Sequence, residues 1–445
     1  MNVQTMFSHL MTPITNGELW RRNISSVVHL RRLPLYFFLF LLWSLCVLAV
    51  APPSSAGSPF NVEASKNYNL ICDDVRRNIN ASPPRSSRAG PNLTTRCLSF
   101  GGSEGAPGAT GGSTGTGTLL APSAIQARLR KLKEDGNEVE IGGPAGASAD
   151  GTVPLGRGIN VFAAPGYERL NKHNNPYEDG YRSDVARLTI GADYKMKDWL
   201  VGGIALTYGS HDGNYDDGKG FTNHAYGVSF YSSVLPSERI FIDIVGGYTF
   251  YDFNEEFVRR LFNDALTPPP LVFRGTVHTD RSGHGINGGI LAGYDAPFSN
   301  ITIGPRVGFN ASYIHYDDYR EQGNTGLELR YESESESSLQ SSLGAAASIA
   351  LSTSFGVLLP QIEAAWVHEF ADDRRSQEAR YVEAPPDSPS FQYDSEAPDR
   401  NFGVIGVALT AVLPNGLQPF TAFRAIVGND NYNSYAVSAG LRLEL

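Results

Sequence analysis

The chain has 445 residues and carries 36 basic and 46 acidic side chains, a formal net charge of -10. Nucleic acid is excluded as the main partner, because binding to a phosphate backbone requires a basic surface. The 47 glycines, 21 tyrosines and 23 phenylalanines favour an all-β protein. A bundle of membrane helices would instead need repeated apolar runs of about 20 residues.

One long apolar run lies near the N-terminus. Residues 33–51 are almost continuously apolar, follow two pairs of arginines and precede the small-residue stretch PPSSAGSP. A basic segment, an apolar core and small residues predict a secretory signal peptide with an extended n-region over 1–56, and Ala-Val-Ala at 49–51 fits the cleavage pattern. A retained single-pass anchor is the alternative, because the run is just long enough to span a bilayer.

The cysteines bear on export. Cys46 lies inside the predicted signal peptide, which leaves Cys72 and Cys97 as the pair in the exported part of the chain. An even count in an exported protein indicates a disulfide, with two unpaired thiols as the alternative. Closing a loop of this length would add about 3 kcal/mol to the free energy of unfolding.

The region 57–121 is poorly patterned and is expected to be a short Gly/Ser-rich passenger or linker; its stretch 101–118 has the composition of a flexible linker. Next, 122–156 begins with helix signals: Ser123 is a possible N-cap, and apolar residues fall on one face. Taken alone, this is a marginal solvated helix, since short isolated helices barely form in water. Its basic side chains are Arg128, Arg130, Lys131 and Lys133.

From about residue 157 the chain changes to segments that alternate apolar and polar residues with a period of two, which predicts strands with two different faces. In VARLTIGADYKM (185–196), every second residue is apolar or small and the residues between them are mostly polar or charged. Twelve such segments follow one another, at about 158–170, 183–196, 199–211, 222–234, 238–252, 282–296, 300–315, 338–352, 355–370, 401–413, 416–428 and 433–445.

Alternation alone fits either a soluble sandwich or a membrane barrel, because the two differ only in which face meets the interior. The connections decide between them. Short joins such as KDW and PNG alternate with long ones, which include 253–281 and 371–400. Bacterial outer-membrane barrels have short periplasmic turns and longer outer loops. We therefore expect a 12-stranded antiparallel transmembrane β-barrel, preceded by a short N-terminal helix and linker region.

The stretch YAVSAGLRLEL (435–445) has a role in this fold. A sheet in lipid must close, because an open edge leaves backbone groups unpaired in hydrocarbon. The final segment is therefore predicted to pair with the segment near 158–170. The residues predicted to face lipid in this C-terminal assembly strand are Val437, Ala439, Leu441, Leu443 and Leu445.

Four blocks together resemble the translocator β-domain of autotransporters, the type V secretion proteins: 191–209, 341–370, 397–416 and 438–445. The resemblance covers about 157–445. It implies a 12-stranded barrel in the outer membrane of a Gram-negative bacterium that exports or anchors a short N-terminal segment. It also implies the lipid bilayer, the barrel-assembly machinery and the secretion translocon as partners. The catalytic, nucleotide and metal motifs in the chain are incomplete or lie in the wrong structural context, so we predict no enzymatic activity, cofactor or metal. Position 445 departs from the family, which usually ends on an aromatic residue.

By the same resemblance the helix near 122–136 would run through the pore, with its basic residues facing acidic lumen residues. The polar faces of the strands supply the lumen candidates, which are Arg187, Asp193, Asp243, Arg306, Glu363, Glu369, Arg442 and Glu444. The alternatives are a stand-alone or plugged pore, a surface adhesin, and a rim enzyme. The last would use a histidine with nearby aspartates to activate water, either His211 with Asp212 or His315 with Asp317 and Asp318.

Overall fold

The computed structural model describes residues 59–79, 88–99, 107–108, 159–174, 180–197, 199–215, 219–262, 271–414 and 416–444. All of them lie in one compact unit, Ser54–Leu445. The signal peptide predicted over 1–56 lies outside these residues, and so does the helix predicted near 122–136. Of the helices in the described ranges, none has the length and hydrophobicity needed to cross a membrane.

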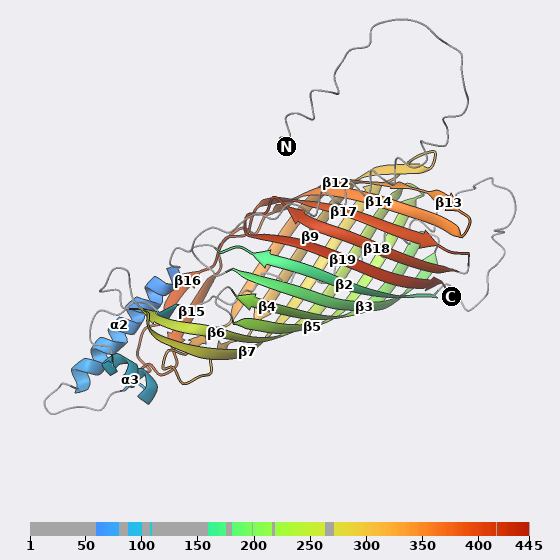
Figure 1. Ribbon diagram of the computed structural model, residues 1–445. Coiled ribbons are helices and arrows are strands. Elements are labelled where there is room, and N and C mark those ends of the chain that lie inside the picture. The colour runs from blue at the N-terminus through green and yellow to red at the C-terminus, as the bar shows by residue number, and fades with distance from the viewer. Residues whose placement is uncertain are drawn as a thin grey trace, which may run out of the picture. The chain divides into compact units, whose positions relative to one another are not determined.

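Twelve long strands form one closed antiparallel barrel, as predicted (Figure 1). Each strand pairs with its neighbours in chain order, and the first pairs with the last. The strands are β2 (Ile159–Lys172), β3 (Tyr181–Lys197), β4 (Leu200–Tyr215), β5 (Gly220–Ser237), β6 (Ile240–Phe262), β7 (Leu271–Tyr294), β9 (Ile301–Tyr316), β12 (Glu334–Ile349), β14 (Gly356–Glu369), β17 (Asn401–Val412), β18 (Leu417–Val427) and β19 (Tyr432–Glu444).

Closure of the barrel follows the predicted pairing. β19 runs antiparallel to β2, with Tyr435 opposite Arg169 and Leu441 opposite Ala163. The short strands β1 (Pro107–Gly108), β8 (Ala296–Phe298) and β13 (Leu351–Thr353) add to single barrel strands. Each backbone edge that lipid would otherwise meet is therefore paired, as a membrane barrel requires.

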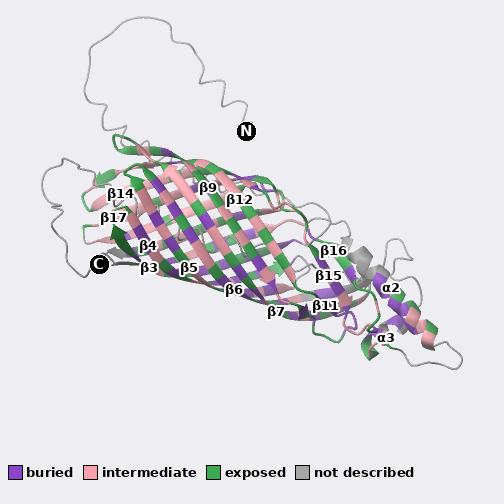
Figure 2. Cartoon of the chain, turned by 180° about the vertical axis from the view of Figure 1, so that it is seen from behind, coloured by how far each residue is buried: buried purple, intermediate pink, exposed green. Residues whose placement is uncertain are grey.

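The two faces of the barrel wall differ as the alternation predicts. Along β3, residues alternate between buried and exposed positions from Tyr181 to Ile190. The exposed set holds Leu188 and Ile190, whereas the buried set holds Arg187 and Thr189. Figure 2 shows this alternation of buried and exposed positions along neighbouring strands. An apolar outer face and a polar interior are the arrangement of a lipid-embedded barrel.

The hairpin of β6 and β7 differs from the sequence prediction. The stretch 253–281 was expected to be a long connection, but β6 continues to Phe262 and β7 begins at Leu271. The two strands stay paired well beyond the predicted segment ends, with Glu255 opposite Thr279 and Arg259 opposite Gly275. Every second residue stays buried in this extension, including Phe253 and Glu255 on β6 and Thr279 and Arg281 on β7. Because several of these buried residues are polar or charged, the sequence does not show the apolar alternation that predicts a strand.

A second sheet and two helices lie at the end of the barrel that carries the long connections. The connections after β9 and β14 contribute β10 (Tyr319–Arg320), β11 (Leu329–Tyr331), β15 (Ser376–Tyr381) and β16 (Phe391–Asp394), which pair in that order. We call these four strands the loop sheet. The N-terminal segment contributes α2 (Pro59–Ile79) and α3 (Pro91–Ser99). Both helices lie in the region 57–121, for which the sequence predicted a passenger or linker and no helix. We call the loop sheet and both helices the cap (Figure 1).

Candidate functional site

The structure places the predicted lumen residues on the inward face of the barrel. This holds for the seven whose side chains it describes, and the side chain of Glu444 lies outside the described set. Their described partners come from the barrel wall. Asp193 accepts a hydrogen bond from the Tyr231 hydroxyl at 3.3 Å, and Asp243 accepts one from Ser233 at 2.7 Å. The seven are Arg187, Asp193, Asp243, Arg306, Glu363, Glu369 and Arg442.

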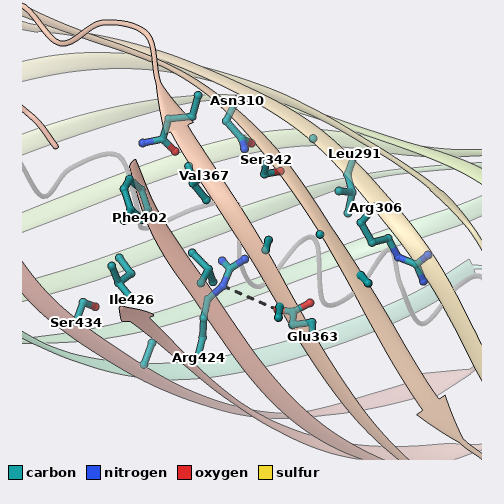
Figure 3. Close-up of a pocket in the computed structure, with 18 of the residues that line it drawn as sticks. Leu291, Arg306, Asn310, Ser342, Glu363, Val367, Phe402, Arg424, Ile426 and Ser434 are labelled. Atoms are coloured by element: carbon teal, nitrogen blue, oxygen red, sulfur yellow. Dashed lines mark ion pairs between the residues drawn. The ribbon is translucent and has the colours of Figure 1, made fainter. Parts of the chain in front are cut away.

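Charged residues from β9, β14 and β18 line a cavity in the lumen (Figure 3). On the wall of this cavity, the Glu363 carboxylate lies 4.0 Å from the Arg424 guanidinium. The Arg306 guanidinium pairs with the Asp295 carboxylate at 2.5 Å. The predicted basic partners of these acids were those of a pore helix, and Arg424 was not among the predicted lumen residues. The signal for Arg424 was weak because its inward neighbour on β18, Ile426, is apolar.

Two further predicted residues are fixed near opposite ends of the wall. Glu369 accepts hydrogen bonds from the Ser338 hydroxyl at 2.6 Å and from the Leu339 backbone N–H at 2.8 Å. Arg442 donates one to Gln418 at 3.1 Å. The pore-helix residues Arg128, Arg130, Lys131 and Lys133 lie outside the residues that the structure describes.

The C-terminal strand presents its apolar residues outward. Val437 and Leu441 are exposed, as is Ala439 between them, whereas Arg442 is buried in the lumen. The side chain of Leu443 and all of Leu445 lie outside the described residues. This part of the strand therefore has the two faces expected of a closing strand in lipid.

The histidines considered for a rim enzyme lie on different faces of the wall. His211 is buried inside the barrel, where its Nε2 lies 2.8 Å from the Ser183 hydroxyl. His315 is on the outward face, with its Nδ1 3.0 Å from Ser335. Asp212, the proposed partner of His211, is exposed on the opposite face of the wall from His211. The described residues also contain no cluster of three or more His, Cys, Asp or Glu side chains placed to hold a metal ion.

The cap has a hydrophobic core of its own, separate from the barrel interior. α2 and α3 bring one face onto the loop sheet, and the disulfide between Cys72 and Cys97 joins the two helices. The Arg76 guanidinium donates to the Cys97 carbonyl at 2.9 and 3.1 Å, which fixes the end of α3 on α2. The buried core consists of Tyr68, Ile71, Cys72, Val75, Leu93, Cys97, Tyr319, Leu327, Leu329, Tyr331, Ala379, Tyr381 and Phe391.

A buried ion pair ties the loop sheet to the extended β6 strand. Arg259 pairs with Glu321, and both side chains are 0% exposed. The Tyr331 hydroxyl donates to Glu321 at 3.0 Å, and the Leu329 backbone N–H donates at 2.8 Å. Burial raises the pKa of the Glu321 carboxyl, while the Arg259 charge and these donors oppose the rise. Such a pair fixes geometry, because separating the partners leaves a buried charge unpaired.

The comparisons with known proteins agree with this geometry. The family model described as "Autotransporter beta-domain" matches residues 161–424, more than half of the chain. The chain is 25% identical over 296 residues to "Outer membrane protein A" of Rickettsia conorii, a match that covers 65% of this chain and 14% of that protein. A protein of the same name from Rickettsia rickettsii is 24% identical, with 65% and 12% covered.

Among solved structures, the translocator domain of the autotransporter NalP from Neisseria meningitidis is similar in fold. The TM-score is 0.50 at 14% identity, and the match covers 74% of this chain and 100% of that domain. The chain spans only a small part of the length of its two curated relatives. It belongs to the autotransporter β-domain family, and its barrel lies in the outer membrane of a Gram-negative bacterium.

Proposed function

We propose that this barrel brings its own short N-terminal segment to the outer surface of the cell and anchors it there. The long connections mark the outer end of the barrel, because barrels of this class have short periplasmic turns. The observation that carries the proposal is the position of α2 and α3. They pack on the loop sheet, which is built from two of those long connections.

The start of the barrel supports this direction. β2 begins at Ile159, which pairs with Tyr194 close to the short turn that follows β3. α3 ends at Ser99 in the cap, beside the long connections. The chain between these two points therefore joins the outer end of the barrel to its periplasmic end. An N-terminal segment that passed outward during export would leave this arrangement.

The proposed partners follow from the route by which the chain would reach the outer membrane. A signal peptide over 1–56 would deliver the chain to the secretion translocon. The alternating C-terminal strand would be recognised by the barrel-assembly machinery. We assign the protein no catalytic activity, because the candidate pairs do not converge. His211 is buried and contacts Ser183, while Asp212 is exposed on the other face. His315 contacts Ser335.

Surface labelling of intact cells tests the proposal. An epitope inserted before Pro59 should bind antibody on intact cells, and so should one at Pro386 in the connection between β15 and β16. A control epitope at Ser354, in the short turn before β14, should bind only after the outer membrane is permeabilised. If the epitope before Pro59 behaves like the Ser354 control, the N-terminal segment is not on the outer surface and the proposal is wrong.

A further inference from the structure

The loop sheet offers a surface shaped for one particular partner. Its strands are two to six residues long and could not bury an apolar face by themselves. Aromatic side chains from the sheet meet the helices, with Tyr381 and Tyr68 ring centroids 6.1 Å apart. Leu93 of α3 is 0% exposed in this core. The core therefore needs residues from both the loops and the N-terminal segment.

Glu383, in the connection after β15, holds the start of α3. Its carboxylate accepts hydrogen bonds from the Leu93 backbone N–H at 2.7 Å and from the Asn92 side chain at 3.0 Å. Its backbone carbonyl accepts one from the Gly90 N–H at 2.8 Å. The first turn of a helix has unpaired N–H groups and a positive end of the dipole, both of which a carboxylate satisfies. A barrel loop thus supplies the cap that α3 lacks in its own sequence.

Gly326, in the connection between β10 and β11, allows α3 to approach the loop closely. A side-chain carbon added there would lie 2.6 Å from the Asn92 carbonyl carbon and 2.6 Å from the Leu93 nitrogen. Gly326 also has a φ of 76°, a conformation that favours glycine. The Glu328 carboxylate holds this turn by accepting from the Thr325 and Gly326 N–H groups at 2.6 and 2.9 Å.

An ion pair adds a polar contact at the edge of the same surface. Arg88, between the helices, donates to both oxygens of Asp387 at 2.9 and 2.5 Å. On α2, the Asn67 side chain donates to the Pro389 carbonyl at 2.7 Å. Residues 383–389 therefore contact the segment through main-chain, amide and charged groups at separate points.

We propose that the loop sheet is a docking site for the two-helix segment 59–99 and holds it by non-covalent contacts alone. The covalent link to the barrel, through the Gly/Ser-rich stretch 101–118, is not needed for retention. The segment and the outer loops then act as one domain, completed only after the segment reaches the outer side. This inference rests on the proposed function, but it fails separately from it.

The test uses the full chain with a site for a specific protease inserted between residues 101 and 106 and an epitope before Pro59. Intact cells are treated with the protease, washed, and assayed for the epitope on cells and in the supernatant. We expect the cut segment to stay on the cells through repeated washing. α2 and α3 both lie before the cut, so they stay in one continuous fragment, which the Cys72–Cys97 disulfide also cross-links.

Two pairs of variants separate specific docking from general damage. Gly326→Ala should release the cut segment at least ten times faster, because its added carbon meets the α3 backbone. Gly428→Ala is the matched control: Gly428 also has a positive φ, of 71°, in an outer connection, but nothing lies within 4 Å of the added carbon. Glu383→Ala should speed release roughly 2- to 30-fold, the usual effect of losing a helix cap. Glu378→Ala, at a partly buried carboxylate of β15, is its control.

The outcomes discriminate between the two proposals. If the wild-type segment leaves the cells as soon as the linker is cut, docking is overturned while the exported position stands. If Gly326→Ala and Gly428→Ala release at the same rate, the close contact with α3 is not the basis of retention. If the epitope is not reached on intact cells before cutting, the proposed function fails first. Heat-modifiable gel migration confirms in each variant that the barrel has folded.

Discussion

Replacing Glu321 with glutamine should loosen the cap while leaving the barrel intact. Gln keeps the shape of Glu321 and can still accept from the Leu329 N–H, but it removes the negative charge beside Arg259. Both partners are 0% exposed, so the Arg259 charge would remain buried without its counter-charge. Breaking a buried ion pair in this way costs about 3–5 kcal/mol. A loss of about 3 kcal/mol in stability raises the population of molecules in which the loop sheet has separated from β6 roughly 100-fold.

Hydrogen exchange measured by mass spectrometry on the protein in nanodiscs reports this opening locally. In Glu321→Gln, the amides of β10, β11 and β15 should exchange at least about 100 times faster, whereas those of β2 to β5 should not change. Asp318→Asn is the matched control in the same sheet. Asp318 pairs with Arg330 at 3.3 Å, but the two side chains are 59% and 43% exposed, so the loss should stay below about 1 kcal/mol.

A double variant checks the cause. Arg259→Met combined with Glu321→Gln removes both charges and keeps an acceptor for the Leu329 N–H, so protection should largely return. If Glu321→Gln exchanges like the wild type, the ion pair does not hold the loop sheet on the extended β6 strand. If the double variant is as open as the single one, the unpaired charge is not the reason for the loss.

Three further changes have defined outcomes. Cys72→Ser removes a cross-link that spans 25 residues to Cys97, so the cap should lose about 3 kcal/mol and its helices should be digested faster by added protease; unchanged digestion would contradict this. The hydrogen bond from Arg88 lowers the pKa of Asp387, so this pair stabilises the cap above the unfolded pKa of about 3.9 and weakens as pH falls through the folded value. Release of the cut segment should therefore rise below about pH 4 and depend less on pH in Asp387→Asn; equal pH profiles would refute the assignment. Deleting 434–445 removes most of the strand that pairs with β2 and β18, so heat-modifiable migration should disappear, and its persistence would disprove closure through this strand.

The barrel could be predicted because its signal is local. A strand in a barrel wall places successive side chains on opposite faces, so each segment carries its own evidence in a period of two. The closing pairing needed one more physical argument, that lipid tolerates no open edge, and β19 does pair with β2. The ends of β6 and β7 could not be predicted, since the buried face of the extended hairpin mixes Phe253 and Val277 with the charged Glu255 and Arg281, and the contrast between the two faces is lost.

The cap could not be predicted for the opposite reason. β10 has two residues and β11 three, too few to show alternation, and β11 pairs with β15 about 50 residues away. One helical signal was present: Tyr68, Ile71, Cys72 and Val75 follow the i, i+3, i+4, i+7 spacing of an apolar face, and all four are buried. That stripe, with a cysteine inside it, indicates a helix whose partner lies elsewhere in the chain, but the sequence alone does not reveal that the partner is a pair of outer loops.

A cysteine pair at positions 90 and 383 tests most directly whether the N-terminal segment lies on the outer loops of its own barrel. A side-chain carbon built on Gly90 lies 2.7 Å from the Cγ of Glu383, close to where the sulfur of a cysteine at 383 would be, which is within the reach of a disulfide. Gly90→Cys with Glu383→Cys should form this bond in living cells, and a membrane-impermeant reductant added outside should break it. Gly90→Cys with Gly428→Cys should remain unlinked. Failure of the first pair to link, or a bond that the external reductant cannot reach, would contradict the account.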